Sequence, residues 1–384
     1  MPQDHIGFYD PAACSLKEFQ ELTTQQTSQA DVPLASDIQK NVPIYAAQSL
    51  ASDLAQDRRW LLSEWAWVLD QGPGVFVIKG AQPNLAAIDQ ATETYLQIIA
   101  EEKAASGSGA DHFAAAGSND RIWNSLQKLC LTAPEVFAQY FASPIIDAAC
   151  EAWLGPNYQM TAQVNLVHPG GQAQQAHRDY HLGFQTAEVS ATYPAHVHDL
   201  SPLMTLQGGI AHCDVPIESG PTKLLPYSQL YRPGYAAWRR EDFRADFEER
   251  YIQLPLEKGD AIFFNPALFH AAGENRSSDI ERMVNLLQIS SAFGRAMETV
   301  DRTAMCLAAF DALKAAQMDE ASLDAVISST AEGYSFPTNL DSDPPVGGLA
   351  PKTQQALLKV AVLSGWDKAT FATELTAMAE RQKA

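Results

Sequence analysis

The sequence predicts an α+β fold with a mainly β core, a sandwich or jelly roll (double-stranded β-helix) flanked by N- and C-terminal helices. Short runs of strand character, separated by turn signals, fill residues 158–293. Helical periodicity dominates before and after this stretch. The 384 residues are 46% hydrophobic, which is a globular composition, and contain no internal repeat. One elaborated β core with helices from both ends is therefore the simplest architecture.

The N-terminal part begins with an extension, residues 1–60, that we expect to wrap a core rather than to form a domain. Apolar residues at helical spacing predict a helix over 58–69, and the Gln71-Gly72-Pro73-Gly74 run ends it. The β-branched and aromatic residues 75–78 predict a short buried strand. The elements expected before the core are a helix over 84–103, a loop rich in Ala, Gly and Ser over 104–118, and a helix or helix pair over 133–153.

The predicted core begins with residues 159–168, where polar and apolar side chains alternate. Gln163 and Asn165 face one side of this strand, and Met160, Ala162, Val164 and Leu166 face the other. Further strands are expected over 203–213, 251–256, 261–265 and 283–291. Helical spacing resumes over 301–332 and 351–382. The predicted division is an extension over 1–60, a jelly-roll domain over 61–295 and a C-terminal helical extension over 296–384.

Charge and composition exclude several function classes. The formal net charge is −20, and Lys and Arg form no stripe, so nucleic acid is not an expected partner. No apolar run reaches the roughly 20 residues that cross a bilayer, and the start lacks signal-peptide character. The five cysteines are widely spaced and predict reduced thiols. We therefore expect a cytoplasmic protein that binds a small molecule and no membrane, and a homodimer stays open.

A set of candidate metal ligands follows the Gly170-Gly171 turn. On an extended segment His177 and Asp179 project to the same side, so an imidazole nitrogen and a carboxylate oxygen can share one ion. If His270 lies on a strand of the same barrel, it completes the two-His, one-carboxylate set of non-haem Fe(II) oxygenases. The His-x-Asp spacing alone is weak. His177 could equally be a loop histidine paired with its neighbour, and His212 with Asp214 forms a rival pair.

Arg282 begins the alternating strand that follows His270. It shares one face with Val284 and Leu286, and a cation on an apolar barrel face requires an anionic partner. A keto acid that chelates iron at one end and reaches Arg282 with its far carboxylate would supply that partner. The alternative is an ion pair within the chain, to Asp260, Asp279 or Glu281.

Residues 155–290 resemble the phytanoyl-CoA dioxygenase family of Fe(II)/2-oxoglutarate-dependent oxygenases. Four ordered segments carry the likeness: Leu154–Asn157, His177–Asp179, Glu218–Ser228, and Gly259–Phe264 leading to His270 and Arg282. The third resembles an Asn-Gly-Pro-Thr…Pro-Gly-Ser-His segment of the family, with Tyr227 in place of a glycine. The resemblance implies a jelly roll that uses Fe(II), 2-oxoglutarate and O2, with His177, Asp179 and His270 as metal ligands. His212 and Asp214 then become structural.

The resemblance also implies roles around the co-substrate. Arg282 would bind the far carboxylate of 2-oxoglutarate, although it follows its histidine by twelve residues instead of about eleven, and Arg276 is the alternative. The serine that relatives often place two residues after the histidine is Ala272 here, and Ser277 is a candidate replacement. By position, Asn165 and Gln163 resemble residues that contact the co-substrate, but they could equally line the substrate cavity. Candidates for substrate contact or for the cavity rim are Tyr180, His181, Trp238, Arg239 and Arg240, of which Trp238–Arg240 could also form an exposed helix face.

The resulting functional hypothesis is a dioxygenase that hydroxylates a C–H bond of a small metabolite and releases succinate and CO2. Two alternatives stay open at this point. One is a cupin-like metal-dependent isomerase or hydrolase without 2-oxoglutarate, and the other is a catalytically silent binding protein of the same fold.

Overall fold

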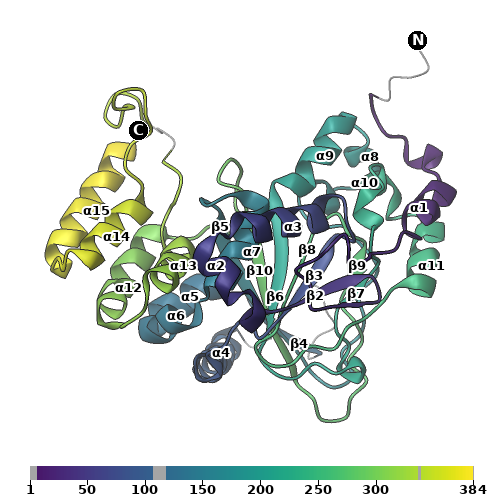
Figure 1. Ribbon diagram of the computed structural model, residues 1–384, viewed down its shortest axis with the longest axis horizontal. Helices are drawn as coiled ribbons and strands as arrows, with labels where there is room; N and C mark the ends of the chain where they lie inside the picture. Colours follow the sequence, from purple (N-terminus) through teal and green to yellow (C-terminus); the bar gives the residue numbers. More distant parts are fainter. Residues whose placement is uncertain (1–6, 107–117, 336–338, 384) are drawn as a thin grey trace.

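A large sheet of eight strands forms the centre of the molecule (Figure 1). The computed structural model describes residues 7–106, 118–335 and 339–383. The strand order is β1-β2-β3-β8-β6-β10-β5-β4, antiparallel throughout except for the parallel pair β2–β3. The strands are β1 Asp37–Gln39, β2 Val42–Ala46, β3 Val75–Lys79, β4 Asn119–Ile122, β5 Gln159–Val167, β6 Thr205–Ala211, β8 Ala261–Phe264 and β10 Arg282–Ser290.

A second, smaller sheet pairs β7 (Lys223–Leu224) with β9 (His270–Ala271). Isolated bridges extend it on both sides, between His177 and His270 and between Leu224 and Ile252. Four segments that are far apart in the sequence thus lie side by side in one antiparallel layer. Together with the large sheet this layer forms the double-stranded β-helix, so the predicted fold class is confirmed.

Helices surround these sheets. Those before the core are α1 Leu16–Leu22, α2 Ala51–Gln56, α3 Arg59–Asp70, α4 Leu85–Ser106, α5 Ser125–Thr132, α6 Pro134–Tyr140 and α7 Pro144–Leu154. Those within and after it are α8 Ala187–Ser190, α9 Ala195–Leu203, α10 Gly234–Ala237, α11 Glu241–Arg250, α12 Arg302–Ala315, α13 Glu320–Thr330, α14 Gln354–Leu363 and α15 Lys368–Gln382. The short 3-10 helices are η1 Pro11–Ala13, η2 Ala47–Leu50, η3 His181–Phe184, η4 Ile217–Ser219 and η5 Ser228–Leu230. Among the described helices, none is long and apolar enough to cross a membrane.

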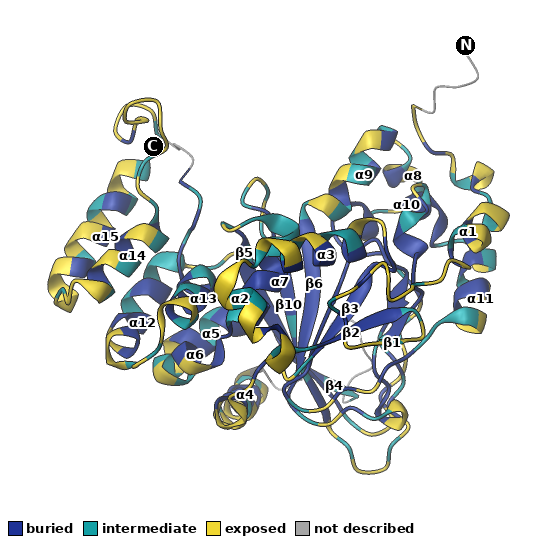
Figure 2. Cartoon of the chain, in the orientation of Figure 1, coloured by how far each residue is buried: buried dark blue, intermediate teal, exposed yellow. Residues whose placement is uncertain are grey.

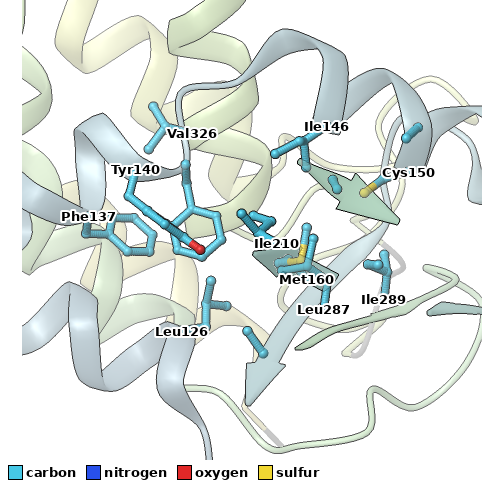
Figure 3. Close-up of a cluster of buried hydrophobic side chains, with 14 of the residues drawn as sticks. Leu126, Phe137, Tyr140, Ile146, Cys150, Met160, Ile210, Leu287, Ile289 and Val326 are labelled. Carbon is cyan, nitrogen blue, oxygen red and sulfur yellow. The ribbon is translucent and has the colours of Figure 1, made fainter. Parts of the chain in front are cut away.

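The main hydrophobic core fills the space between the helices and one face of the large sheet (Figure 2). Figure 3 shows Ile210 of β6 and Leu287 and Ile289 of β10 in one cluster with side chains of the helices, among them Tyr140 of α6 and Cys150 of α7. Burying each such side chain stabilises the fold by about 1.5–3 kcal/mol. Because strand side chains alternate, this packing leaves the opposite face of the same strands for the space between the two sheets.

Most predicted elements are present, and the helix pair expected over 133–153 is α6 and α7. The strand predicted over 251–256 is wrong, because these residues make only single bridges, at Ile252 and Leu256. Pro255 lies between them and has no N–H for a continuous ladder. The extension over 1–60 supplies β1 and β2, which the sequence did not predict as strands. Of the loop predicted over 104–118, residues 107–117 lie outside the described residues.

His212 and Asp214, the alternative His-x-Asp pair, contact different parts of the structure. The His212 ring is buried, with Thr92 Oγ1 2.8 Å from Nδ1 and the Tyr140 hydroxyl 2.7 Å from Nε2. Asp214 instead accepts a hydrogen bond from the Lys258 backbone N–H. Burial lowers the pKa of His212 to about 3, so its imidazole is neutral at neutral pH. His212 is therefore a hydrogen-bonded core residue.

The buried imidazole predicts an acid-dependent loss of stability. Since the folded pKa lies below the ordinary value of about 6.5, the unfolded chain binds the proton first as the pH falls. The contribution of His212 to the free energy of unfolding is fully present above pH ~6.5, and below it this contribution falls by roughly 1.4 kcal/mol per pH unit. Urea unfolding at pH 7 and pH 5 should show a loss in the wild type that is about 2 kcal/mol larger than in His212→Gln. Equal losses in both proteins would contradict this role.

Candidate active site

A pocket of about 610 Å³ lies between the two sheets. Its residues from the large sheet include Gln163 and Asn165 of β5, Gln207 of β6, and Val284 and Leu286 of β10. These are the positions opposite the hydrophobic core, as the alternation along β5 and β10 predicts. The second layer contributes His177 and His270 to the facing wall.

The three candidate metal ligands converge in this pocket. His177, Asp179 and His270 each offer one ligand atom, and these atoms all lie within 4.8 Å of one another. Two backbone hydrogen bonds join the histidines: His177 N–H donates to the His270 carbonyl at 3.0 Å, and His270 N–H donates back at 3.2 Å. The Asp179 N–H donates to the Pro266 carbonyl at 3.0 Å. Backbone pairing therefore brings together side chains that are 91 and 93 residues apart.

Each imidazole ring is oriented by its own strand. Nδ1 of His177 lies 2.8 Å from the Gln175 carbonyl, and Nδ1 of His270 lies 2.8 Å from the Leu268 carbonyl. A carbonyl only accepts, so both Nδ1 atoms donate a proton, and the neutral tautomer of each ring has its lone pair on Nε2. These Nε2 atoms lie 3.5 Å and 3.3 Å from the Asp179 carboxylate oxygens. This is the hydrogen-bonding arrangement that fixes histidine as a metal ligand.

Asp179 is half-buried and ionised. Burial raises the pKa of its carboxyl group, yet the His177 and His270 side chains and a hydrogen bond from the Gln207 amide together hold the pKa below its ordinary value. Burial lowers the pKa of His177, which favours the neutral, ligating form of that imidazole. Two imidazole nitrogens and one carboxylate oxygen at this spacing fit a divalent transition metal.

Arg178, between two of these residues, holds the loop in place. Its buried guanidinium donates to the Ser228 carbonyl at 2.6 Å and to the Tyr231 carbonyl at 2.9 Å. Two glycines make room for this side of the loop. A Cβ at Gly234 would lie 1.9 Å from Arg178 Cζ, and one at Gly183 would lie 2.0 Å from the Arg178 carbonyl oxygen. Only glycine fits at these close approaches.

Arg282 lines the same pocket and is buried. Its Nη1 donates to the Ser219 carbonyl at 2.9 Å and to the Gly273 carbonyl at 3.3 Å. No carboxylate of the described residues lies within 4.0 Å of it. The partners considered from the sequence are engaged elsewhere: Asp260 with Lys79, Glu281 with His168, and Asp279 with Ser278. Burial lowers the pKa of Arg282 to about 10, so the guanidinium stays charged at neutral pH.

Amide side chains line the β5 side of the pocket. Gln163 Oε1 accepts from Arg121 at 3.2 Å, whereas Gln163 Nε2 and Asn165 Oδ1 are buried without a hydrogen-bond partner. Tyr180 also lines the pocket, and its hydroxyl donates to Gln288. Gln163, Asn165 and Tyr180 therefore share the cavity with the candidate metal ligands.

Two sequence candidates lie elsewhere. Ser277 is not among the pocket residues; its hydroxyl donates to Asn275 Oδ1 at 2.6 Å within the turn. His181 is exposed, and its Nδ1 lies 3.0 Å from Ser201 Oγ. Ala272 does line the pocket but offers no hydroxyl. In the structure, nothing brings Ser277 or His181 to the pocket.

Other pocket residues were missed or left open by the sequence. Gln207 and Gln288 are directly paired on β6 and β10, and their polar character within apolar strands was a usable signal. Trp238 lines the pocket, which agrees with the prediction that it belongs to the cavity rim. Arg240 does not line the pocket and is paired with Asp242. Arg244, on α11, had no signal in the sequence, because nothing in a polar helix marks the residue that faces a cavity.

Comparison with known families identifies one match. The model of the family described as Phytanoyl-CoA dioxygenase (PhyH) matches residues 71–284. The dioxygenase trt7 of Aspergillus terreus is 27% identical over 149 residues, which are 39% of this chain and 46% of that protein. The dioxygenase andF of Emericella variicolor is 26% identical over 143 residues, 36% of this chain and 45% of that protein. The chain thus spans about half the length of these curated relatives.

Two solved structures are also similar. The epimerase SnoN, in complex with Fe3+, α-ketoglutarate and nogalamycin RO, is 18% identical with a TM-score of 0.42, covering 61% of this chain and 84% of that one. The carbocyclase SnoK from nogalamycin biosynthesis is 20% identical with a TM-score of 0.41, covering 59% and 83%. At these TM-scores the likeness is partial, and the fold assignment depends on the strand pairing described above.

The glycine beside Arg178 predicts a sensitive position. In Gly234→Ala the new methyl group would overlap the Arg178 guanidinium and displace it, so we expect a loss of about 1–3 kcal/mol in the free energy of unfolding. Gly294→Ala is the matched control, because its Cβ would meet only the flexible end of Met204. Thermal denaturation of both variants checks this, and equal midpoints would contradict the tight fit.

Proposed function

The chain belongs to the phytanoyl-CoA dioxygenase family, and on this premise we propose that it is an Fe(II)/2-oxoglutarate-dependent dioxygenase. The reaction we propose is hydroxylation of a C–H bond of a small metabolite, with release of succinate and CO2. The observation that carries the proposal is the convergence of His177, Asp179 and His270 in a pocket that also contains Arg282.

Three protein ligands are typical of a catalytic Fe(II) site, whereas a structural metal site usually has all its positions filled by the protein. His177 and His270 would bind the ion through Nε2, since each Nδ1 proton is held by a carbonyl of its own strand. Asp179 would supply one carboxylate oxygen. Three protein ligands leave positions of an octahedral ion open for 2-oxoglutarate and O2.

Arg282 is the residue we propose for the far carboxylate of 2-oxoglutarate. The described hydrogen bonds use only Nη1 of its guanidinium, which leaves Nε and Nη2 for a ligand. A buried cation without a carboxylate partner is costly, and a dianionic co-substrate would supply that partner. Ser219, whose carbonyl orients Arg282, belongs to the Glu218–Ser228 segment that also resembles the family.

Bound iron with 2-oxoglutarate and O2 supplies the oxidising chemistry of hydroxylation. The residues of this chain bind and orient the reactants. Val284, Leu286 and Ile262 exclude water from the space next to the candidate ligands. Gln207 donates to Asp179 and limits the orientations of that carboxylate. Arg178 fixes the backbone between His177 and Asp179.

Neither alternative function accounts for all the features of the site. A metal-dependent isomerase or hydrolase of this fold would require no buried arginine free to receive a dicarboxylate. A silent binding protein would have no reason to keep both imidazoles oriented with Nε2 toward one point. The unpaired Arg282 and the oriented rings therefore support the oxygenase. The cytoplasmic location, a homodimer and the domain boundaries at residues 60 and 295 stay predictions from the sequence.

The first experiment tests the cofactors directly. Anaerobic protein with Fe(II) and 2-oxoglutarate should develop the visible charge-transfer band of an iron–keto acid chelate. His177→Ala and Asp179→Ala should lose the band and all substrate-dependent release of succinate, because each removes one of three protein ligands. Absence of the band in folded, iron-loaded wild type would favour the isomerase or hydrolase.

A second experiment distinguishes the role of Arg282 from that of the metal ligands. Arg282→Ala should still bind Fe(II) but raise the KM for 2-oxoglutarate by roughly a hundredfold, since removing one partner of a buried charge pair costs about 3 kcal/mol. Arg276→Gln, an exposed arginine six residues earlier, is the matched control and should leave this KM unchanged. Circular dichroism verifies that each variant is folded. An unchanged KM in Arg282→Ala would refute the assignment.

A further inference from the structure

The charged residues of the pocket do not follow the charge of the whole chain. The chain carries a formal net charge of −20, yet the pocket is lined by four arginines and a single carboxylate, Asp179. The arginines are Arg121, Arg178, Arg244 and Arg282. A cationic pocket in an acidic protein indicates that its ligands are anions.

Two of the four arginines already have partners or a proposed role. Arg178 donates to backbone carbonyls and holds the loop of the candidate ligands. Arg282 is proposed to bind 2-oxoglutarate. If Fe(II), Asp179, Arg282 and a dianionic 2-oxoglutarate are counted together, their charges cancel. Of the other two arginines, Arg121 donates to Gln163, whereas Arg244 has no carboxylate within 4.0 Å among the described residues.

Arg244 is the most informative of these. It lies on α11, and its Cζ is 5.4 Å from the ring centroid of Trp238, which also lines the pocket. Arg239 stacks on the same indole at 3.8 Å and donates to the Gly183 carbonyl at 3.0 Å. Within the described ranges, no carboxylate lies within 4.0 Å of Arg239 or Arg244. Two guanidinium groups thus share one indole ring without an ion pair. The exposed carboxylate of Glu188 raises the pKa of Arg239, but less than Arg244 lowers it.

Several polar atoms of this cluster are buried and unsatisfied. They are Nε of Arg244, Nη1 of Arg239 and Nε1 of Trp238, each without a hydrogen-bond partner. Buried donors are almost always paired in folded proteins, so three unpaired donors at one place indicate a missing acceptor. Burial lowers the pKa of Arg239, and the Coulomb repulsion of Arg244 lowers it further, which an anion between them would relieve.

The rest of the pocket wall is suited to an apolar body. Trp123, Phe184, Met297 and Leu286 line it, and Phe184 is 51% exposed, which places it toward solvent. Arg121 lies over the Trp123 ring at 5.1 Å and donates to Gln163. The pocket therefore combines a cluster of cationic donors with aromatic and aliphatic surface.

We propose that the substrate is a small amphiphilic anion whose carboxylate or phosphate group binds to Arg244 beside Trp238. Arg239 does not line the pocket, but it places a second positive charge on the same indole. This inference deepens the proposed function and rests on it, because it assigns the substrate of the same pocket. Planar guanidinium groups bind either oxyanion in a bidentate manner, so carboxylate and phosphate share this chemistry.

Binding of matched probes tests the inference. Protein with Fe(II) and saturating 2-oxoglutarate, kept anaerobic so that Arg282 is occupied, is titrated with 3-phenylpropionate, phenyl phosphate and uncharged 3-phenylpropionamide. Quenching of tryptophan fluorescence reports binding. At least one of the two anions should bind at least tenfold more tightly than the amide, and the tighter anion identifies the preferred oxyanion. No binding of either anion, or equal binding of the amide, would overturn the inference.

Variants locate the preference. Arg244→Gln should lose about tenfold in affinity for the preferred anion, or roughly 1.4 kcal/mol, with little change for the amide. Arg244→Lys keeps the charge and should retain most of the preference, whereas Arg276→Gln, an exposed site outside the pocket, should retain all of it. An unchanged anion affinity in Arg244→Gln would refute the site.

The same samples distinguish a failure of the proposed function from a failure of the proposed substrate class. The visible iron–keto acid band is recorded before each titration. Absence of the band in folded wild type would refute the proposed function. A normal band in wild type and in Arg244→Gln, without any preference for anions, would refute only the substrate class.

Discussion

The pair of backbone hydrogen bonds between His177 and His270 is the constraint on which the site depends. It closes the second layer of the jelly roll and places two imidazoles 4.5 Å apart between ring centroids. The Nδ1 contacts to Gln175 and Leu268 then fix both rings. Sheet pairing and ring orientation therefore arise from the same strands, so the pairing that builds the second layer also positions the candidate metal ligands.

The remaining parts of the pocket follow from the alternation of the strands. Side chains of β5, β6 and β10 that point away from the helices line the space between the sheets, and these include Gln163, Gln207 and Arg282. The neighbouring positions are packed in the hydrophobic core. A register shift of one residue in β10 would exchange Arg282 and Met283 between pocket and core. The packing of the core thus fixes the strand register, and the register determines which polar residues line the pocket.

The sequence predicted the parts of the site that depend on local spacing and alternation. His177, Asp179 and His270 came from motif order, and Gln163, Asn165 and Arg282 from strand periodicity. Arg244 and Arg239 were beyond prediction as a cluster, because their approach to Trp238 depends on how α10 and α11 pack. Ser277 shows the same limit, since a turn at Asn275 holds its hydroxyl away from the cavity. Pro255 likewise limited a predicted strand to single bridges.

The central claim is that three side chains from two distant segments bind one ferrous ion beside 2-oxoglutarate. Anomalous diffraction at the iron edge, from crystals grown anaerobically with both ligands, tests it most directly. The account predicts one iron peak at about 2.0–2.2 Å from Nε2 of His177, Nε2 of His270 and one Asp179 oxygen, by analogy with zinc–ligand distances. An iron peak at any other place in the chain, or ligation through either Nδ1, would contradict it.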